Sequence, residues 1–201
     1  MKKLLISLIV VATVLSTTKL QSLTVLQLNL EQMTALSEKV FAGKCVGVQE
    51  RKDKAGRPVQ YVTFKVLEML KGEPVSQVTF KQLGYKAPPL DRDTAVQGFF
   101  REMPTYSEGE EAVLFLSAEG KLGFTAPIGI YQGKFDVVNQ QGQKMVVNGA
   151  GNAGLFMGIK KSPRFKSLSL TSSEKNLLNT SAQEIPYENF ISMVKKIAAS
   201  E

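Results

Sequence analysis

The reactive side chains in this sequence are few, and the residue types that it lacks exclude several kinds of catalysis. Its 201 residues include no histidine and one cysteine, Cys45. Catalysis by a serine or cysteine that histidine activates is therefore excluded, and so are zinc and copper sites built on histidine. Cys45 has no histidine to act as its base. Its place between Gly43 and Gly47 in a strand-like run predicts a small buried side chain, and one cysteine cannot form an intrachain disulfide.

Paired carboxylates are the remaining candidates for a metal or acid-base site. Asp91 and Asp93 flank Arg92, which is typical of a turn exposed to solvent, and Glu110 and Glu111 form a second pair. Calcium needs six or more oxygen ligands, and no stretch has the acidic spacing of an EF-hand loop. The sequence therefore predicts no metal-binding and no catalytic residue. A histidine-independent hydrolase built from a serine and a lysine stays open as an alternative, because distant residues can meet in a fold.

One segment matches a phosphate-binding pattern. Residues 149–154 read Gly-Ala-Gly-Asn-Ala-Gly, which is G-x-G-x-x-G, and Glu174 follows 20 residues later. A dinucleotide site needs a helix that begins at these glycines, so that its first amides hold the pyrophosphate. Gly158 and Pro163 interrupt the run that follows, and it has no helical period. The segment is therefore predicted to be a loop, and no cofactor is expected.

The first 22 residues have the pattern of a cleavable signal peptide. Two lysines precede an apolar run from Leu4 to Leu15, and cleavage is predicted after Ser16 or Ser22. The run is shorter than the roughly 20 residues that a membrane-spanning helix needs, so no stable membrane span is expected. An uncleaved membrane anchor is the alternative. The sequence thus predicts an exported protein, periplasmic or extracellular.

The net charge of the chain is mildly basic. It is +7 for the whole chain and +4 without residues 1–22, which hold three lysines and no acidic residue. A bias of this size favours weak attraction to anionic surfaces and does not require nucleic acid, so no nucleic-acid partner is predicted. A second alternative is therefore a cell-envelope structural protein that binds anionic surfaces. Its basic residues would be Lys160, Lys161, Arg164 and Lys166.

The pattern of apolar residues predicts a set of strands between two helices. Asn29 and Gln32 resemble a capping box, so a short helix is expected over residues 30–38. Apolar residues at helical spacing after Pro186 predict an amphipathic helix over residues 186–199 that packs on the strands. Strands are predicted at residues 40–49, 61–70, 75–82, 112–116, 121–125, 128–138 and 145–147.

These elements predict a chain of four parts. The signal peptide (1–22) precedes a β-barrel domain (23–147), a Gly/Lys/Ser-rich irregular segment (148–183) and a C-terminal helix packed on the barrel (184–201). The strand at 112–116 is apolar at every position, so both of its faces must be covered. We therefore expect a mainly β fold, a small closed or partly open antiparallel barrel (OB/netrin-like) with a short N-terminal helix and a C-terminal amphipathic helix.

The longest stretch without a clear period runs from residue 83 to residue 110. A loop of this length is uncommon inside a compact domain and often has a function. Phe99, Phe100 and Tyr106 lie in it, and aromatic side chains are frequent anchors in protein-binding patches. These three are the predicted binding residues. The alternative is that they fold back over the open end of the sheet, because exposed aromatic rings are unfavourable without a partner.

Part of the chain resembles a family of uncharacterised bacterial exported proteins. The family has no assigned activity, and its members often sit beside matrixin-like secreted zinc proteases. The resemblance therefore implies a protein partner, with a secreted metalloprotease as the specific one. It is carried by residues 40–46, 66–72, 78–80, 104–116 and 132–135.

A more distant resemblance is to the netrin-like barrel, an OB-type fold found in tissue inhibitors of metalloproteinases. The similar features are a helix, a long hairpin, the Leu-Lys-Gly turn at 70–72, a strand, a long loop and Gly-Glu-Glu at 109–111. Those inhibitors chelate the protease zinc through a disulfide-tied N-terminal cysteine, and this chain has none there. The resemblance implies the fold, and the chelating mechanism carries over to no residue. The sequence thus predicts an exported, non-catalytic binding module.

Overall fold

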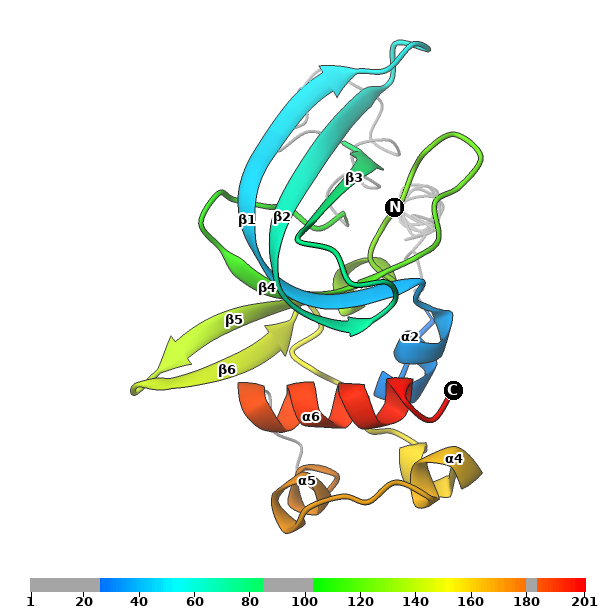
Figure 1. Ribbon diagram of the computed structural model, residues 1–201, viewed down its shortest axis with the longest axis vertical. Coiled ribbons are helices and arrows are strands. Elements are labelled where there is room, and N and C mark those ends of the chain that lie inside the picture. Colours follow the sequence, from blue (N-terminus) through cyan, green and yellow to red (C-terminus); the bar gives the residue numbers. More distant parts are fainter. Residues whose placement is uncertain (1–25, 85–102, 180–183) are drawn as a thin grey trace, which may run out of the picture.

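The computed structural model describes residues 26–84, 103–179 and 184–201, and over these ranges the protein is mainly β (Figure 1). Seven strands form one antiparallel sheet in the order β3-β2-β1-β4-β5-β6-β7, and its two edge strands do not pair with each other. The prediction of a mainly β, partly open barrel is confirmed, and its closed alternative is not observed. The predicted signal peptide lies outside the described residues. The strands are β1 (Lys39–Lys52), β2 (Pro58–Lys71), β3 (Gln77–Leu83), β4 (Glu111–Leu116), β5 (Lys134–Gln140), β6 (Gln143–Asn148) and β7 (Ile185–Pro186).

Strands β1 and β2 form a long, bent hairpin (Figure 1). Their register shifts at three points between residues 40 and 47, and irregularities of this kind bend a strand and increase its twist. Gly43 is required at one of them, because a Cβ there would lie 2.9 Å from the backbone oxygen of Lys65. Together with β3 and β4, the bent hairpin encloses one of two apolar clusters, which we call the barrel-side cluster. Its largest members are Phe41, Phe64, Phe80, Tyr106, Leu114 and Leu116.

Strand β4 separates the two apolar clusters. Its residues alternate between the faces of the sheet, as strand geometry requires. Leu114 belongs to the barrel-side cluster, whereas Val113 and Phe115 belong to the second, which we call the helix-side cluster. All of these side chains are buried. The prediction that residues 112–116 form a strand covered on both faces is therefore confirmed.

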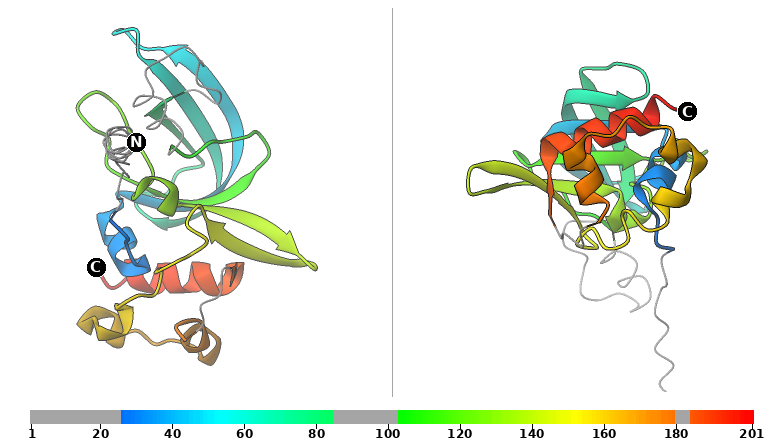
Figure 2. Two further views of the ribbon diagram at one scale, coloured as in Figure 1. Left: turned by 180° about the vertical axis from the view of Figure 1, so that it is seen from behind. Right: turned by 90° about the horizontal axis from the view of Figure 1, so that it is seen from below.

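Two predicted helices are present at the ends of the described chain. Helix α2 (Leu30–Leu36) begins with the expected capping box, in which Asn29 and Gln32 each bond the other's backbone amide. Helix α6 (Tyr187–Ala198) packs its apolar side on the sheet. There the ring of Phe190 lies 4.6 Å, between centroids, from that of Phe135. Figure 2 shows α6 beneath the sheet, with α4 and α5 on its far side.

Two strands were predicted between residues 121 and 138; the first is wrong, and the second is wrong at its start. Residues 121–125 form a loop, in which the amide of Gly120 donates to the carbonyl of Phe124 and Gly123 has a φ of +75°. Residues 128–133 form a 3₁₀ turn (Ile130–Gln132), so the strand predicted from 128 begins only at Lys134. The glycine before it, Gly133, has no room for a side chain, because a Cβ would lie 2.5 Å from the Ile128 carbonyl oxygen.

The segment predicted to be irregular contains short helices and contributes to the core. It includes a 3₁₀ turn (Ile159–Lys161), helix α4 (Pro163–Lys166) and helix α5 (Ser172–Leu177). Leu155, Ile159 and Phe165 are buried in the helix-side cluster. Scattered apolar residues without a helical period therefore cover the outer side of α6.

Helix α5 has a buried carboxylate that stabilises the fold in a pH-dependent way. Glu174 is 1% exposed, and its carboxylate accepts hydrogen bonds from Lys196 Nζ and from the Thr171 amide. Burial alone would raise the pKa of Glu174. The hydrogen bonds from Lys196 and Thr171 outweigh that effect and hold the pKa below its ordinary value of 4.5.

Replacing Glu174 with glutamine should lower the free energy of unfolding by about 1–2 kcal/mol at neutral pH, since hydrogen bonds to a charged group are lost. Because the folded pKa is lowered, this contribution is complete above the unfolded pKa and disappears as the pH falls through the folded value. Urea unfolding of Glu174→Gln and wild type across acidic pH measures the difference. Glu188→Gln, on the exposed side of α6, is the control, and a difference that does not shrink in acid would contradict the assignment.

Candidate functional site

The three predicted binding residues differ in where they lie. Phe99 and Phe100 lie outside the described residues. Tyr106 is 2% exposed and belongs to the barrel-side cluster, where its ring packs edge-on against Phe64 and Phe80 at centroid distances of 5.8 and 5.5 Å. For this residue the structure agrees with the alternative interpretation, in which the ring folds back over the sheet. Its apolar surface is therefore not available to a partner.

The hydroxyl of Tyr106 is buried without a hydrogen-bond partner among the described residues. Burial, and then the negative charges of Glu110 and Asp136, raise the pKa of Tyr106 well above its ordinary value of 10. The phenol therefore stays protonated and can donate. A buried polar group without a partner destabilises a fold by about 1–3 kcal/mol, so native proteins seldom keep one without a reason.

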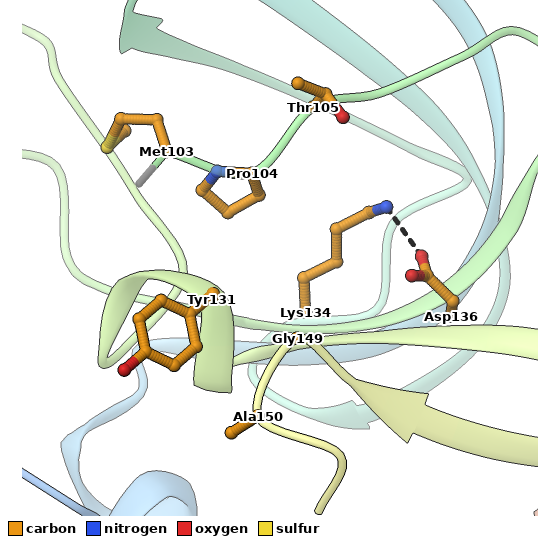
Figure 3. Close-up of a pocket in the computed structure, with 8 residues that line it drawn as sticks. All are labelled: Met103, Pro104, Thr105, Tyr131, Lys134, Asp136, Gly149 and Ala150. Atoms are coloured by element: carbon orange, nitrogen blue, oxygen red, sulfur yellow. Dashed lines mark hydrogen bonds and ion pairs between the residues drawn. The ribbon is translucent and has the colours of Figure 1, made fainter. Parts of the chain in front are cut away.

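Beside Tyr106 lies a buried lysine, Lys134, in an ion-pair network. Its ammonium is 2.6 Å from a carboxylate oxygen of Asp136, 3.2 Å from one of Glu110 and 5.2 Å from the centroid of the Tyr106 ring. Only 11% of the Lys134 side chain is exposed, against 50% for Asp136. Figure 3 shows Lys134 directed toward Asp136. The lysine thus holds two carboxylates near the unpartnered phenol.

Local strand geometry positions these groups. Lys134 and Asp136 are two residues apart on β5, so their side chains lie on the same face, and their backbones pair with Leu114 and Ala112 of β4. Glu110 precedes β4, and its carbonyl accepts the Cys45 amide of β1 at 2.8 Å. The ion pairs therefore join groups from β5 and from the chain that enters β4.

Two adjoining pockets open around Lys134, with volumes of about 570 and 660 Å³. They share Thr105, Lys134 and Asp136, and we call the combined surface the Lys134 face. Figure 3 shows the first of the two pockets. The first pocket is lined by Met103, Pro104, Thr105, Tyr131, Lys134, Asp136, Gly149 and Ala150. The second is lined by Thr105, Gly109, Glu110, Glu111, Lys134, Asp136, Val137, Val138, Asn139 and Lys144.

The second pocket is acidic although the chain is basic. Three carboxylates line it, those of Glu110, Glu111 and Asp136, against the ammonium groups of Lys134 and Lys144. Lys144 is 2.6 Å from Glu111, so both lysines are already paired. The lining carries a net charge of −1, whereas the whole chain carries +7. The pocket therefore favours a cationic group over an anionic one.

Cys45 and the carboxylate pairs are the reactive groups that the sequence points to. Cys45 is buried as predicted, and burial raises the pKa of its thiol, which stays protonated. Among the described residues, no group of three or more cysteine, aspartate and glutamate side chains could hold a metal ion. Asp91 and Asp93 lie outside those residues. Residues 149–154 form consecutive turns and begin no helix, as predicted.

Sequence reasoning noticed one part of this site and missed the rest. It paired Glu110 with Glu111, but these neighbours bind different lysines, Lys134 and Lys144. The missed signal was the spacing of Lys134 and Asp136, opposite charges two residues apart at the start of a strand, on either side of buried Phe135. In a strand that spacing places an ion pair on one face.

Other surfaces give weaker functional signals. Lys160, Lys161 and Lys166 are exposed, and Arg164 lies 3.7 Å from Glu201. In the described ranges, no helix combines the length and apolar character that crossing a bilayer requires.

Removing the Tyr106 hydroxyl tests directly whether it stabilises the fold. Replacing Tyr106 with phenylalanine should leave the free energy of unfolding unchanged or raise it by up to about 1 kcal/mol, because it removes a buried polar atom without a partner. Urea unfolding measures this. A clear destabilisation would mean that the hydroxyl has a partner in the folded chain, and that it is not free for a ligand.

Comparison of the chain with family models, with curated proteins and with solved structures finds no match.

Proposed function

We propose that this protein is an exported, non-catalytic binding module whose Lys134 face contacts a protein partner. The observation that carries the proposal is the Lys134 ion-pair network, which lines two adjoining pockets and lies beside the buried, unpartnered Tyr106 hydroxyl. Polar groups that are held in place but not satisfied gain most from a ligand that completes their hydrogen bonds.

The chemistry of the face supports binding and not turnover. Lys134 is tied to two carboxylates, and the Tyr106 phenol and the Cys45 thiol both stay protonated. A nucleophilic hydroxyl, thiol or amine needs a neighbouring base that takes its proton, and a general base needs a lone pair aimed at the substrate. Two open pockets lined by both polar and apolar groups instead fit the side chains of a protein surface.

The specific partner that we propose is a secreted metalloprotease. This part of the proposal rests on the resemblance of five segments between residues 40 and 135 to exported proteins found beside such proteases, and on no contact in the structure. It is tested separately, by measuring peptide hydrolysis by secreted metalloproteases with and without the purified protein. Unchanged hydrolysis would remove the protease as the partner and would leave the binding module standing.

Site-specific photo-crosslinking tests the binding module itself. A photoreactive residue is placed at Asn139, an exposed residue of the Lys134 face, and the matched control carries it at exposed Lys121, in the loop between β4 and β5. In native culture medium, the Asn139 variant should yield a discrete cross-linked product that the Lys121 variant does not. Equal products from both positions, or none from Asn139, would refute the Lys134 face as the contact surface.

A second candidate function is attachment to an anionic surface through Lys160, Lys161 and Lys166. The specific observation is that these three lysines are exposed and make no ion pair within the described residues. Binding of this kind weakens steeply with salt. Sedimentation with vesicles that contain anionic lipid should therefore be lost at moderate salt, and in a variant with all three lysines changed to glutamine. Salt-resistant sedimentation would contradict this candidate.

A further inference from the structure

Strand β5 continues beyond the strand that pairs with it. Its pairing with β4 ends at Asp136, opposite Ala112, whereas β5 runs on to Gln140. Residues 137–140 pair with β6 on one side, and no strand in the described part of the chain pairs with them on the other. The β5–β6 hairpin accordingly projects from the body of the protein (Figures 1 and 2).

The register shows which backbone groups face the open side. The carbonyl of Gly133 accepts the Phe115 amide, so this residue points its backbone groups toward β4. Backbone groups alternate sides with a period of two. Asn139 therefore directs its amide and carbonyl to the same side, beyond the last paired residue of β4, where they can bond another strand. Its side chain is exposed and accepts the Gly142 amide at 2.9 Å.

The open edge lies along the second, acidic pocket. Val137, Val138 and Asn139 form one wall, and residues 109–111 contribute to the lining. The carboxylates of Glu111 and Asp136 are 31% and 50% exposed, respectively, so they remain accessible. An added strand would therefore meet unpaired backbone and accessible carboxylates at the same edge.

We propose that this edge of β5 accepts an extended segment of the partner protein as an additional strand, and that the segment carries a basic side chain placed among Glu110, Glu111 and Asp136. The proposal rests on the proposed binding function and specifies its ligand. Strand addition takes affinity from main-chain hydrogen bonds and specificity from pockets for alternate side chains. A second copy of this chain is a poorer occupant, because pairing the same edges would bring two sets of these carboxylates together.

The test uses fluorescent peptides and the full chain. The probes are a short peptide of alternating lysine and valine, the same peptide with alternate backbone amides methylated, and its counterpart with glutamate in place of lysine. Anisotropy should show binding of the first peptide, with affinity at least about tenfold lower for the other two. Methylation keeps the charge and removes the backbone donors, so it separates strand addition from electrostatic attraction.

Substitutions at this edge of β5 test strand addition independently of the peptide series. Asn139→Pro removes the amide that faces the open side, and Asn139→Ala removes only the side chain. The alanine variant should bind the basic peptide like wild type, and the proline variant should lose at least about tenfold in affinity while keeping its circular dichroism.

Equal binding of the methylated peptide, preference for the glutamate peptide, or no binding of any peptide would overturn strand addition. If any of these results occurred together with a cross-link from Asn139, strand addition would be wrong but the proposed binding function would stand. Self-association of the free protein that Asn139→Pro abolishes would overturn the assignment to a partner and make a second copy the occupant.

Discussion

Replacing Phe135 with alanine lowers the free energy of unfolding by about 4 kcal/mol, the largest stability effect that we expect from one substitution. The side chain is fully buried, and its ring packs against Phe190 of α6 and Phe115 of β4 at centroid distances of 4.6 and 5.5 Å. Alanine would leave a cavity where the sheet and the C-terminal helix meet. Neighbouring rings on rigid elements can fill such a space only in part.

Urea unfolding measures the effect of Phe135→Ala. The control is Leu122→Ala, at a leucine that is 62% exposed, where a change within about 0.5 kcal/mol is expected. Because Phe135 lies between Lys134 and Asp136 on β5, its loss also loosens the strand that holds the ion pairs. A loss below about 1 kcal/mol would mean that α6 does not pack on the sheet in this way.

Replacing Lys134 with methionine lowers the free energy of unfolding by about 2 kcal/mol. Loss of one partner from a fully buried pair typically destabilises a protein by about 3–5 kcal/mol. The expected value is smaller because half of the Asp136 side chain is exposed to water. Methionine keeps most of the side-chain volume, so the change in the free energy of unfolding comes mainly from the lost positive charge. In the wild type that charge offsets the repulsion between the carboxylates of Glu110 and Asp136.

A double-mutant cycle isolates that charge effect. Adding Glu110→Gln to Lys134→Met should recover about 1 kcal/mol, because it removes the repulsion between the two carboxylates. Lys144→Met is the control, since its pair with Glu111 is more exposed and should contribute less than about 1 kcal/mol. Strict additivity of the two substitutions would show that Lys134 does not hold the carboxylates as the geometry indicates.

The fold could be predicted from the sequence where local and tertiary signals agree. The capping box at Asn29, the apolar run at 112–116 and the helical spacing near Phe190 each specify one element, and each is present. The prediction failed at 121–125, where Gly123 with its positive φ lies in a loop although the apolar pattern favours a strand. An alternating apolar pattern carries no information about the backbone conformation at a glycine, so it could not reveal this turn.

The candidate site was less predictable than the fold. Tyr106 was a predicted binding residue, with burial over the sheet as the alternative, and its neighbours in space, Phe64 and Phe80, come from β2 and β3. Lys134 meets Glu110 only because β4 and β5 pair in a particular register. Contacts between residues far apart in the chain depend on strand register, which a single sequence does not specify closely.

Hydrogen exchange on the full chain is the most direct test that the Lys134 face is the contact surface. The measurement compares the free protein with its complex with the protein captured by the Asn139 cross-link. Exchange should slow at residues 109–111 and 134–140 and stay unchanged at residues 159–166. Protection confined to the basic segment, or the same exchange at 134–140 with and without the partner, would contradict the account.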